Sequence, residues 1–259
     1  MLATHAANAA SSELPRLHRL TMDALRAEER ANPDSVEVKI AIVRKLGQVS
    51  PSEALTVIDL IDTSDQPEDI RRIITAYRCE QNIRQGESAV AEPYCDALKE
   101  LVNQRVADST SLTIAYHALG YFYIRAGQAE QALRQLEAAL KLPDLVDDVL
   151  TVQLLHNRGV ALMLSGLPEL AIEAFNSANE AKIALAEDDV LPIILAYNLG
   201  YVQAQAGNHE EALKSYASTV PWLEETGQLT RVYISHTQVA LSLSGLGRHQ
   251  EALDELLPW

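Results

Sequence analysis

The sequence predicts an all-α fold, a helical solenoid of about six helix-turn-helix repeats. Turn glycines recur between segments that have the apolar periodicity of helices, and they lie 39, 41 and 40 residues apart: Gly127, Gly166, Gly207 and Gly247. A parallel series of alanines steps by 37, 41, 39, 41 and 40 residues: Ala54, Ala91, Ala132, Ala171, Ala212 and Ala252. A fixed period of this length with helix–turn–helix content is typical of a solenoid.

The clearest repeat is Ala196–Tyr216, which reads as two helices broken by a turn at Gly207. Gly200 falls midway along the first helix, where a residue without a side chain lets two helices cross closely. Ala212 falls at the matching point of the second helix, and Tyr216 follows one turn later, where its ring can fill the space beside the glycine. We therefore expect Gly200, and its equivalent Gly159, to be buried where the paired helices meet.

The rest of the chain is divided around this array. We expect residues 1–12 to be disordered and residues 13–33 to form an N-terminal capping helix, because apolar residues recur on one face as far as Ala31. Residues 35–259 form the predicted solenoid. Before residue 109 its repeats are degenerate, with helix pairs expected over 35–47 with 51–61 and over 69–85 with 87–103.

The order of small residue, aromatic, turn glycine, alanine and aromatic or Leu resembles the tetratricopeptide repeat, with the best copies at Ala115–Leu142 and Ala196–Tyr216. The resemblance implies a right-handed solenoid that binds proteins or peptides and is not an enzyme. The period near 40 is longer than is usual in the family. Repeats of this length resemble those in the sensory regions of bacterial signalling proteins such as diguanylate cyclases. We therefore expect a sensory or scaffolding module. A structural oligomerisation module and a small-molecule sensor in the concave groove are the alternatives.

In tetratricopeptide arrays the first helix of each pair lines the concave groove, which gives this chain a set of candidate peptide-binding residues. They are His117, Tyr121, His156, Asn157, Tyr197, Asn198, Tyr201 and Gln238. Asn and Gln offer both a donor and an acceptor, so they can pair with a peptide backbone whatever its side chains. We expect Asn157 and Asn198 to lie outside the core. Asn is also common at this point of the repeat for local structural reasons, so a structural role is the alternative.

Several function classes are disfavoured by composition. The net charge of −15 argues against binding to nucleic acid or to an anionic membrane surface. No apolar run is long enough to span a membrane, and no phosphate-binding loop or nucleophile motif is present. Equivalent places in neighbouring repeats lie about 10 Å apart, which is too far for His117 and His156 to share a metal ion. We therefore expect no enzyme activity, no cofactor and no metal site.

The two cysteines, Cys79 and Cys95, fall at the repeat places of Gly120 and Leu136, so both are expected in the core of one helix pair. Two cysteines make no disulfide framework, and we expect buried free thiols in preference to a disulfide. A cytoplasmic location follows as the default.

Two further expectations concern charge and the end of the chain. Acidic clusters at 144–148 and 187–189 stand between repeats, where carboxylates cap helix N-termini. The chain stops at Trp259, part-way through a second helix. Because a solenoid needs a polar terminal cap, we expect either a longer protein or a homodimer formed through this end.

Overall fold

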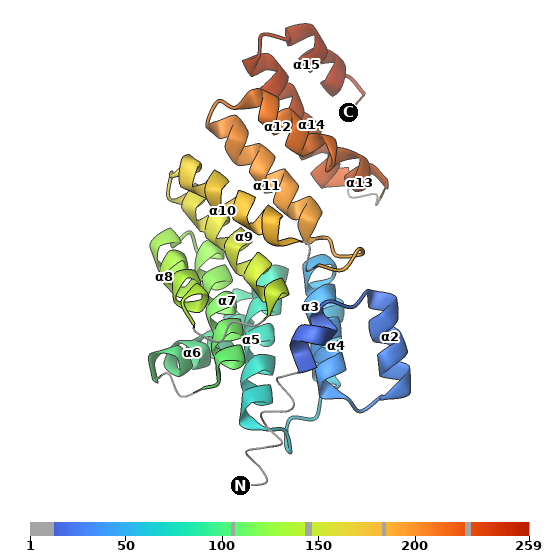
Figure 1. Ribbon diagram of the computed structural model, residues 1–259, viewed down its shortest axis with the longest axis vertical. Coiled ribbons are helices and arrows are strands. Elements are labelled where there is room, and N and C mark those ends of the chain that lie inside the picture. Colours follow the sequence, from blue (N-terminus) through green and yellow to red (C-terminus); the bar gives the residue numbers. More distant parts are fainter. Residues whose placement is uncertain (1–12, 105–106, 143–146, 183–184, 226–228, 259) are drawn as a thin grey trace.

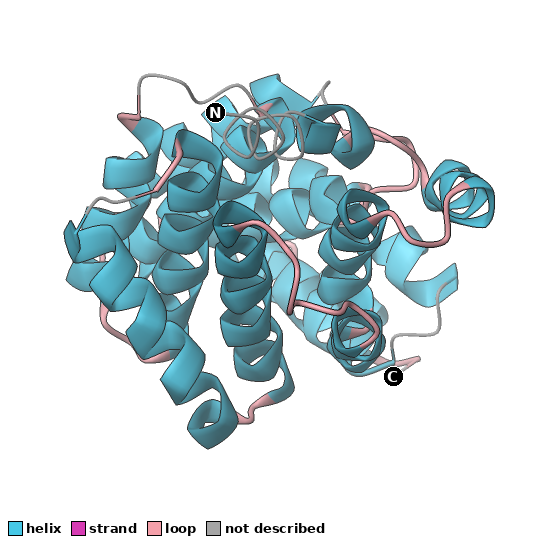
Figure 2. Ribbon diagram, turned by 90° about the horizontal axis from the view of Figure 1, so that it is seen from below, coloured by secondary structure: helices cyan, strands magenta, loops and turns pink. Residues whose placement is uncertain are grey.

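The computed structural model describes residues 13–104, 107–142, 147–182, 185–225 and 229–258 (Figure 1). These residues form helices and loops without a strand (Figure 2), which confirms the predicted all-α solenoid. A short helix over 13–18 comes first. The following helices are α2 (Met22–Ala31), α3 (Val36–Val49), α4 (Pro51–Asp59), α5 (Glu68–Gln85), α6 (Ser88–Gln104), α7 (Ser109–Arg125), α8 (Ala129–Leu140), α9 (Asp148–Leu164), α10 (Pro168–Ala181), α11 (Leu191–Gln205), α12 (His209–Ala217), α13 (Val220–Glu225), α14 (Leu229–Gly245) and α15 (His249–Leu256).

The six predicted helix pairs are present along the long axis of the molecule. They are α3 with α4, α5 with α6, α7 with α8, α9 with α10, α11 with α12, and α14 with α15. The degenerate early pairs lie within a few residues of their expected bounds. One helix was not expected: α13 is a short insertion between α12 and α14, and it packs against α14.

Glycine ends the first helix of five pairs in the left-handed conformation. The φ angles are between 69° and 86° at Gly86, Gly127, Gly166, Gly207 and Gly247. The residue after each glycine donates its backbone N–H to a carbonyl five positions earlier, as Asn208 does to Gln203 at 2.8 Å. This bond is the one that closes a Schellman turn. The turn glycines therefore set the period of the array because residues with a Cβ atom rarely adopt this conformation.

Close helix crossings occur at the predicted small residues. A Cβ atom added at Gly159 would lie 2.6 Å from the ring of Phe175, and one added at Gly200 would lie 2.8 Å from the ring of Tyr216. Both glycines are buried, and both rings are fully buried. In both pairs the second helix fills the space beside the glycine with a large side chain, which stands one turn after the recurring alanine of the repeat, as expected for Tyr216.

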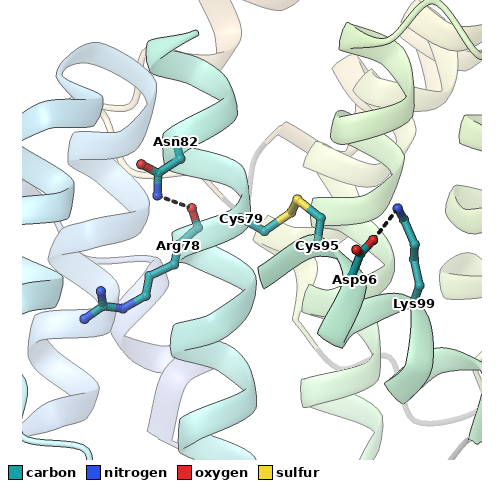
Figure 3. The surroundings of a disulfide bond; sticks show 6 residues. All are labelled: Arg78, Cys79, Asn82, Cys95, Asp96 and Lys99. Carbon is teal, nitrogen blue, oxygen red and sulfur yellow. Dashed lines mark hydrogen bonds and ion pairs between the residues drawn. A yellow bond between two sulfur atoms is a disulfide. The ribbon is translucent and has the colours of Figure 1, made fainter. Parts of the chain in front are cut away.

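The cysteines occupy the predicted core positions, but the prediction of free thiols is wrong. Cys79 on α5 and Cys95 on α6 form a disulfide with a Cα–Cα distance of 5.1 Å (Figure 3). Both residues are fully buried. Their repeat places are those of Gly120 and Leu136, which are in close contact in the next pair. In the pair α7 and α8 the helix crossing places Gly120 against Leu136. The same crossing in the pair α5 and α6 places the sulfur atoms of Cys79 and Cys95 together.

The N-terminal segment differs from the single capping helix expected over 13–33. Its helix is interrupted at residues 19–21, and Thr21 caps the start of α2 by accepting a hydrogen bond from the backbone N–H of Ala24. The break turns the short first helix inward, so that Leu14, Leu17 and His18 are all buried. The division between cap and solenoid stays a prediction, and residues 1–12 lie outside the described part of the chain.

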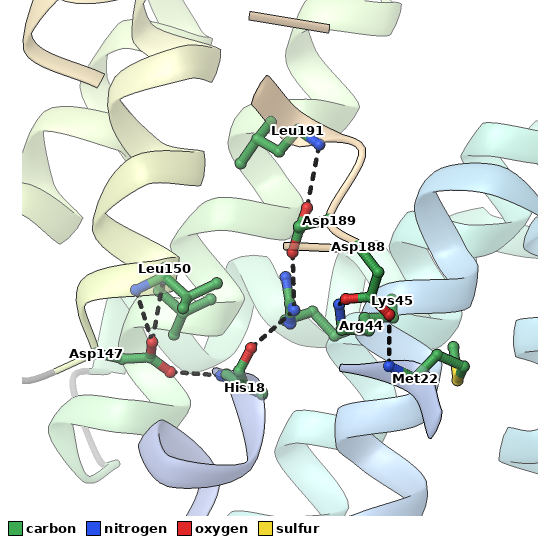
Figure 4. Close-up of polar contacts among 10 residues, drawn as sticks. His18, Met22, Arg44, Lys45, Asp147, Leu150, Asp188, Asp189 and Leu191 are labelled. Atoms are coloured by element: carbon green, nitrogen blue, oxygen red, sulfur yellow. Dashed lines mark hydrogen bonds and ion pairs between the residues drawn. The ribbon is translucent and has the colours of Figure 1, made fainter. Parts of the chain in front are cut away.

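Buried and partly buried ion pairs connect the N-terminal part of the chain to loops far along the sequence (Figure 4). We call this set the N-terminal clamp; it consists of His18, Arg44, Lys45, Asp147, Asp188 and Asp189. Arg44 Nη2 lies 3.1 Å from Asp189 Oδ2 and also donates to the carbonyl of His18. His18 meets Asp147, and Lys45 meets Asp188. The clamp therefore joins the first helix pair to the segments that precede α9 and α11.

The acidic clusters were expected to cap helix N-termini, and this role is confirmed for Asp147 and Asp189. Asp147 accepts from the backbone N–H of Val149 and Leu150, and Asp189 accepts from that of Leu191. Burial raises the pKa of Asp147, but His18 and the helix N–H groups outweigh it and hold that pKa below its ordinary value. The clamp itself was not foreseen, and residues 143–146 lie outside the described residues.

Candidate ligand-binding site

A cavity of about 400 Å³ lies between the two halves of the solenoid. We call it the central cavity. Its lining comes from α3, α5 and α7 on one side and from the segment α11 to α14 on the other, and consists of Gln48, Arg84, Arg125, Ile193, Ile194, Tyr197, Asn198, Thr219, Trp222, Leu223 and Ile234. The site is therefore assembled from repeats that are not neighbours in sequence.

The repeat geometry places the polar wall of the cavity. Gln48, Arg84 and Arg125 each lie in the last turn of the first helix of a pair. Arg84 and Arg125 stand two residues before the turn glycines Gly86 and Gly127, so they take equivalent places in adjacent repeats. Equivalent places in a solenoid face the same side, which aligns these side chains along one wall.

The opposite wall is formed mainly by the start of α11. Ile193, Ile194, Tyr197 and Asn198 lie within two turns of one another on this helix. The Tyr197 ring packs near that of Tyr216, with 5.9 Å between centroids. Because Tyr216 is locked against Gly200, the ring of Tyr197 rests on a rigid support. The wall thus combines apolar surface with the amide of Asn198.

A chain of buried hydrogen bonds runs from this wall into the core, and we call it the polar ladder. Its members are Asn198, His156, Asn157, His117 and Glu80. Asn198 Nδ2 lies 2.8 Å from His156 Nε2, and His156 Nδ1 lies 3.2 Å from Asn157 Oδ1. Asn157 Nδ2 lies 3.0 Å from His117 Nε2, and His117 Nδ1 lies 3.4 Å from Glu80 Oε2. The ladder crosses α11, α9, α7 and α5.

One arrangement of protons satisfies every step of the polar ladder. Each amide nitrogen must donate, so each histidine accepts at Nε2 and carries its proton on Nδ1. His156 then donates to the Asn157 carbonyl, and His117 donates to the Glu80 carboxylate. The ladder ends at Arg84, which donates to Glu80 from Nε at 2.8 Å. The bonds from Asn198 to Glu80 therefore all point the same way, and the Arg84 bond meets them at the carboxylate from the opposite side.

The charges at the buried end agree with this arrangement. Burial raises the pKa of Glu80, but Arg84 and His117 outweigh it and lower the pKa to about 2, so Glu80 is ionised at neutral pH. Burial lowers the pKa of His156 to about 4, against a smaller opposing effect of its hydrogen bond to Asn157. His156 is therefore neutral at pH 7, as its acceptor role requires.

The predicted site residues fall into three groups. Tyr197 and Asn198 line the central cavity. His117, His156 and Asn157 are buried in the polar ladder, so the expectation that Asn157 lies outside the core is wrong. The remaining three are half-buried outside the cavity lining: Tyr121, Tyr201 and Gln238. Tyr121 instead stacks under Arg84, whose guanidinium carbon is 4.3 Å from the ring centroid.

Sequence reasoning missed the polar wall and Trp222. The predicted residues stand beside the small residue of each first helix, whereas Gln48, Arg84 and Arg125 lie at the ends of those helices. Their common distance from the turn was a signal that could have found them. Trp222 lies on α13, outside the repeat pattern.

Within the described ranges, no group of three or more His, Cys, Asp and Glu side chains is placed to hold a metal ion, and no helix has the length and apolar character needed to cross a membrane.

The polar ladder predicts a pH-dependent stability. Below pH 6.5 the unfolded chain protonates His156, while the folded chain resists protonation until about pH 4, so stability falls as the pH drops through this window. Between pH 7 and pH 5 this residue should account for a loss of about 2 kcal/mol, at about 1.4 kcal/mol per pH unit. Urea denaturation at pH 7 and at pH 5 measures this difference in the free energy of unfolding.

Replacement of His156 by Gln should flatten this dependence, because Gln cannot take up the proton. The matched control is His249→Gln, since His249 is exposed and lies outside the ladder. Equal pH dependence in wild type and His156→Gln would contradict the neutral ladder.

Comparison with known proteins agrees with the helical fold. Residues 114–143, within α7 and α8 and the segment after them, match the tetratricopeptide repeat family. The chain is similar to the crystal structure of a Signal Transduction ATPase with Numerous Domains (STAND) protein with a tetratricopeptide repeat sensor from Pyrococcus horikoshii. The TM-score is 0.69 at 16% identity, covering 99% of this chain and 41% of that one.

A second similar structure is the apo form of RapI, with a TM-score of 0.68 at 13% identity, covering 86% of this chain and 64% of that one. The chain thus spans less than two thirds of either protein, and at these identities the likeness shows the fold alone. Comparison with curated proteins finds no match. The chain therefore carries a tetratricopeptide repeat within residues 114–143, and its fold is that of a tetratricopeptide repeat helical solenoid.

Proposed function

We propose that this chain is a non-enzymatic binding module that holds a peptide segment of a protein partner in the central cavity. The observation that carries the proposal is the cavity itself, in which two walls from separate repeats present hydrogen-bonding and apolar side chains to a volume of about 400 Å³. Pockets of this kind, largely apolar with a few placed polar groups, are the usual form of a binding site.

Asn198 supplies the element that suits a peptide. The polar ladder uses one N–H of its amide, which leaves the carbonyl oxygen and the second N–H for a ligand backbone. The ladder also fixes the orientation of the amide before binding, and such preorganisation reduces the entropy lost on association. Trp222 and Ile194 offer apolar contact for ligand side chains beside it.

A sensory role in a larger signalling protein is the extension of this proposal. It is supported by the similarity to a STAND protein whose tetratricopeptide repeats are described as a sensor, of which this chain covers 41%. The expected resemblance to diguanylate cyclases stays a prediction. A sensory module of this kind would report cavity occupancy to the rest of the protein.

The test uses the immobilised chain and a pool of acetylated, amidated random hexapeptides, with retained peptides measured by mass spectrometry. Wild type should retain a reproducible subset. Asn198→Ala should reduce retention about two- to tenfold, the effect of one neutral hydrogen bond. Trp222→Ala should reduce it as well. The control Glu210→Ala, at an exposed residue of α12, should not. Retention that is equal in all four proteins, with equal helicity by circular dichroism, would refute binding in the cavity.

Self-association through the C-terminal pair is the second candidate. Apolar side chains remain exposed there, including Leu241 at 58%, Leu253 at 57% and Leu257 at 78%. In the preceding pairs the corresponding face is covered by the next helix pair. Light scattering of the chain should then show a dimer, and Leu253→Glu should convert it to a monomer. A monomer at all concentrations would leave peptide binding as the sole proposal.

The cytoplasmic location expected from the sequence stays a prediction. The Cys79–Cys95 disulfide weighs against it, because disulfides are rare in cytosolic proteins and persist in oxidising compartments.

A further inference from the structure

We propose that His236 is a proton-dependent latch between three helices of the C-terminal half, and that the loss of one proton releases α13 from α14. We call the three side chains His236, Glu224 and Glu255 the histidine latch. The latch operates in the chain without a ligand, so it goes beyond the proposed binding function and does not depend on it.

The first observation is that both ring nitrogens of His236 meet a carboxylate. His236 lies on α14 and is 7% exposed. Its Nδ1 atom lies 2.5 Å from Glu255 Oε1 on α15, and its Nε2 atom lies 3.2 Å from Glu224 Oε1 on α13. One imidazole ring therefore connects α13 and α15 through α14.

This arrangement requires a definite number of protons. An ionised carboxylate only accepts hydrogen bonds, so each ring nitrogen must carry a proton in order to donate to it. The imidazolium ion has both protons, whereas the neutral ring has one and turns a lone pair towards the other carboxylate. The three groups thus hold both bonds only while they share one extra proton. Loss of that proton to solvent breaks one of the two bonds.

The bond to Glu224 is the one that should break. It is the longer of the two, and the Glu224 side chain is 44% exposed, against 28% for Glu255. Water therefore replaces the lost bond more readily at Glu224. The proton that remains on Nδ1 keeps the bond to Glu255. Deprotonation should consequently release α13 and leave α15 attached.

Release of α13 would reach the central cavity. This helix has six residues and packs against α12 and α14. Trp222 and Leu223 of α13 line the cavity. A helix of this length is not stable by itself in water, so its position depends on its contacts with the rest of the chain. Loss of the Glu224 bond should therefore increase local opening of α13 and loosen this wall of the cavity.

The other charged groups around the latch keep their charges in the relevant pH range. α14 packs against α11, α12, α13 and α15. The titratable side chains of α11 are Tyr197 and Tyr201, and α12 adds Tyr216. Asp, Glu and Lys side chains ordinarily keep their charges between pH 5.5 and pH 8.5, and Tyr stays neutral there. The charged side chains outside the latch on α12, α13 and α15 are all exposed: Glu210, Glu211, Lys214, Glu225, Glu251 and Asp254.

Two further histidines on these helices lie well away from His236. His209 on α12 packs against Gly245, and His249 Nδ1 on α15 lies 3.3 Å from Ser244 Oγ. Gly245 and Ser244 follow His236 on α14 by nine and eight residues. At 1.5 Å per residue this is about 12–14 Å along the helix. Charges at that distance are largely screened at physiological ionic strength, so His236 is the group whose titration operates the latch.

The experiment measures amide hydrogen exchange by mass spectrometry at pH 5.5 and pH 8.5, which bracket the range in which histidine usually changes its charge. Exchange is corrected for its intrinsic pH dependence. Residues 216–225 report on α13, and residues 168–181 of α10 serve as the internal reference. Wild type is compared with Glu224→Gln and with the matched control Glu225→Gln, which changes the adjacent exposed acid on the same helix.

In wild type the protection of α13 should fall about tenfold from pH 5.5 to pH 8.5, the effect of one charge-assisted hydrogen bond. The protection of α10 should not fall. The polar ladder acts in the opposite direction, because protonation of His156 destabilises the chain at low pH. In Glu224→Gln the amide accepts from the imidazolium or donates to the neutral ring, so protection of α13 should change by less than about twofold. Glu225→Gln should keep the tenfold fall.

Three results would overturn the proposal. Protection of α13 in wild type that is equal or higher at pH 8.5 would refute the latch. A fall that persists unchanged in Glu224→Gln would refute the assignment to the bond between Glu224 and His236. Equal falls in α13 and α10 would show a change of the whole chain in place of a local release.

Discussion

Replacement of Asp189 by Asn is expected to lower the free energy of unfolding by about 3–5 kcal/mol, the usual cost of leaving one partner of a buried ion pair without its counter-charge. Arg44 and Asp189 are both buried. The Nε and Nη1 atoms of Arg44 have no hydrogen-bond partner among the described residues, and the ion pair of this guanidinium is with Asp189. Asn keeps the oxygen that can accept from the N–H of Leu191, which isolates the effect of the charge.

The matched control for this prediction is Asp148→Asn. Asp148 pairs with Arg19 in the same part of the molecule, but both side chains are at least half exposed. An exposed pair contributes about 1 kcal/mol or less, so the control should unfold close to wild type. Urea denaturation followed by far-UV circular dichroism measures both variants. Equal shifts would mean that the N-terminal clamp is not a buried electrostatic link.

The clamp also bears on binding, because its residues adjoin both walls of the central cavity. Arg44 and Lys45 lie one turn before Gln48 on α3, and Asp189 lies just before Ile193 on α11. Loss of the clamp should therefore loosen the spacing between the walls. We expect Asp189→Asn to weaken peptide retention although Asp189 does not line the cavity.

Gly159→Leu is expected to lower the free energy of unfolding by about 1–3 kcal/mol through overpacking. The Cβ atom alone would lie 2.6 Å from the fully buried ring of Phe175, so the ring or the helix must move. The loss should appear even though Leu favours helix more than Gly does. The control Ser177→Leu places the same side chain on the exposed face of α10 and should be nearly neutral. A midpoint for Gly159→Leu at or above wild type would contradict the helix crossing.

The elements that the sequence predicts well are those with local causes. Turn glycines such as Gly207 need a left-handed backbone, and small residues such as Gly200 need a close neighbour, so both leave a period that can be read directly. The six helix pairs follow from that period. The insertion α13 follows no period, and for this reason it was missed.

The features that the sequence did not reveal depend on contacts between distant segments. His18 and Asp147 are 129 residues apart, and nothing in either local pattern indicates the other. Asn157 has the residue type and the repeat place of a groove residue, but a histidine in the preceding repeat covers it. The positions of Cys79 and Cys95 were predicted, yet position alone does not decide between thiols and a disulfide.

The central claim is that a peptide binds between the two halves of the solenoid, and a crystal structure of the chain with its most strongly retained hexapeptide tests it most directly. We expect the peptide in the central cavity, with its backbone bonded to Asn198 and an apolar side chain against Trp222. A peptide bound on the outer face, with the cavity residues untouched, would contradict the account.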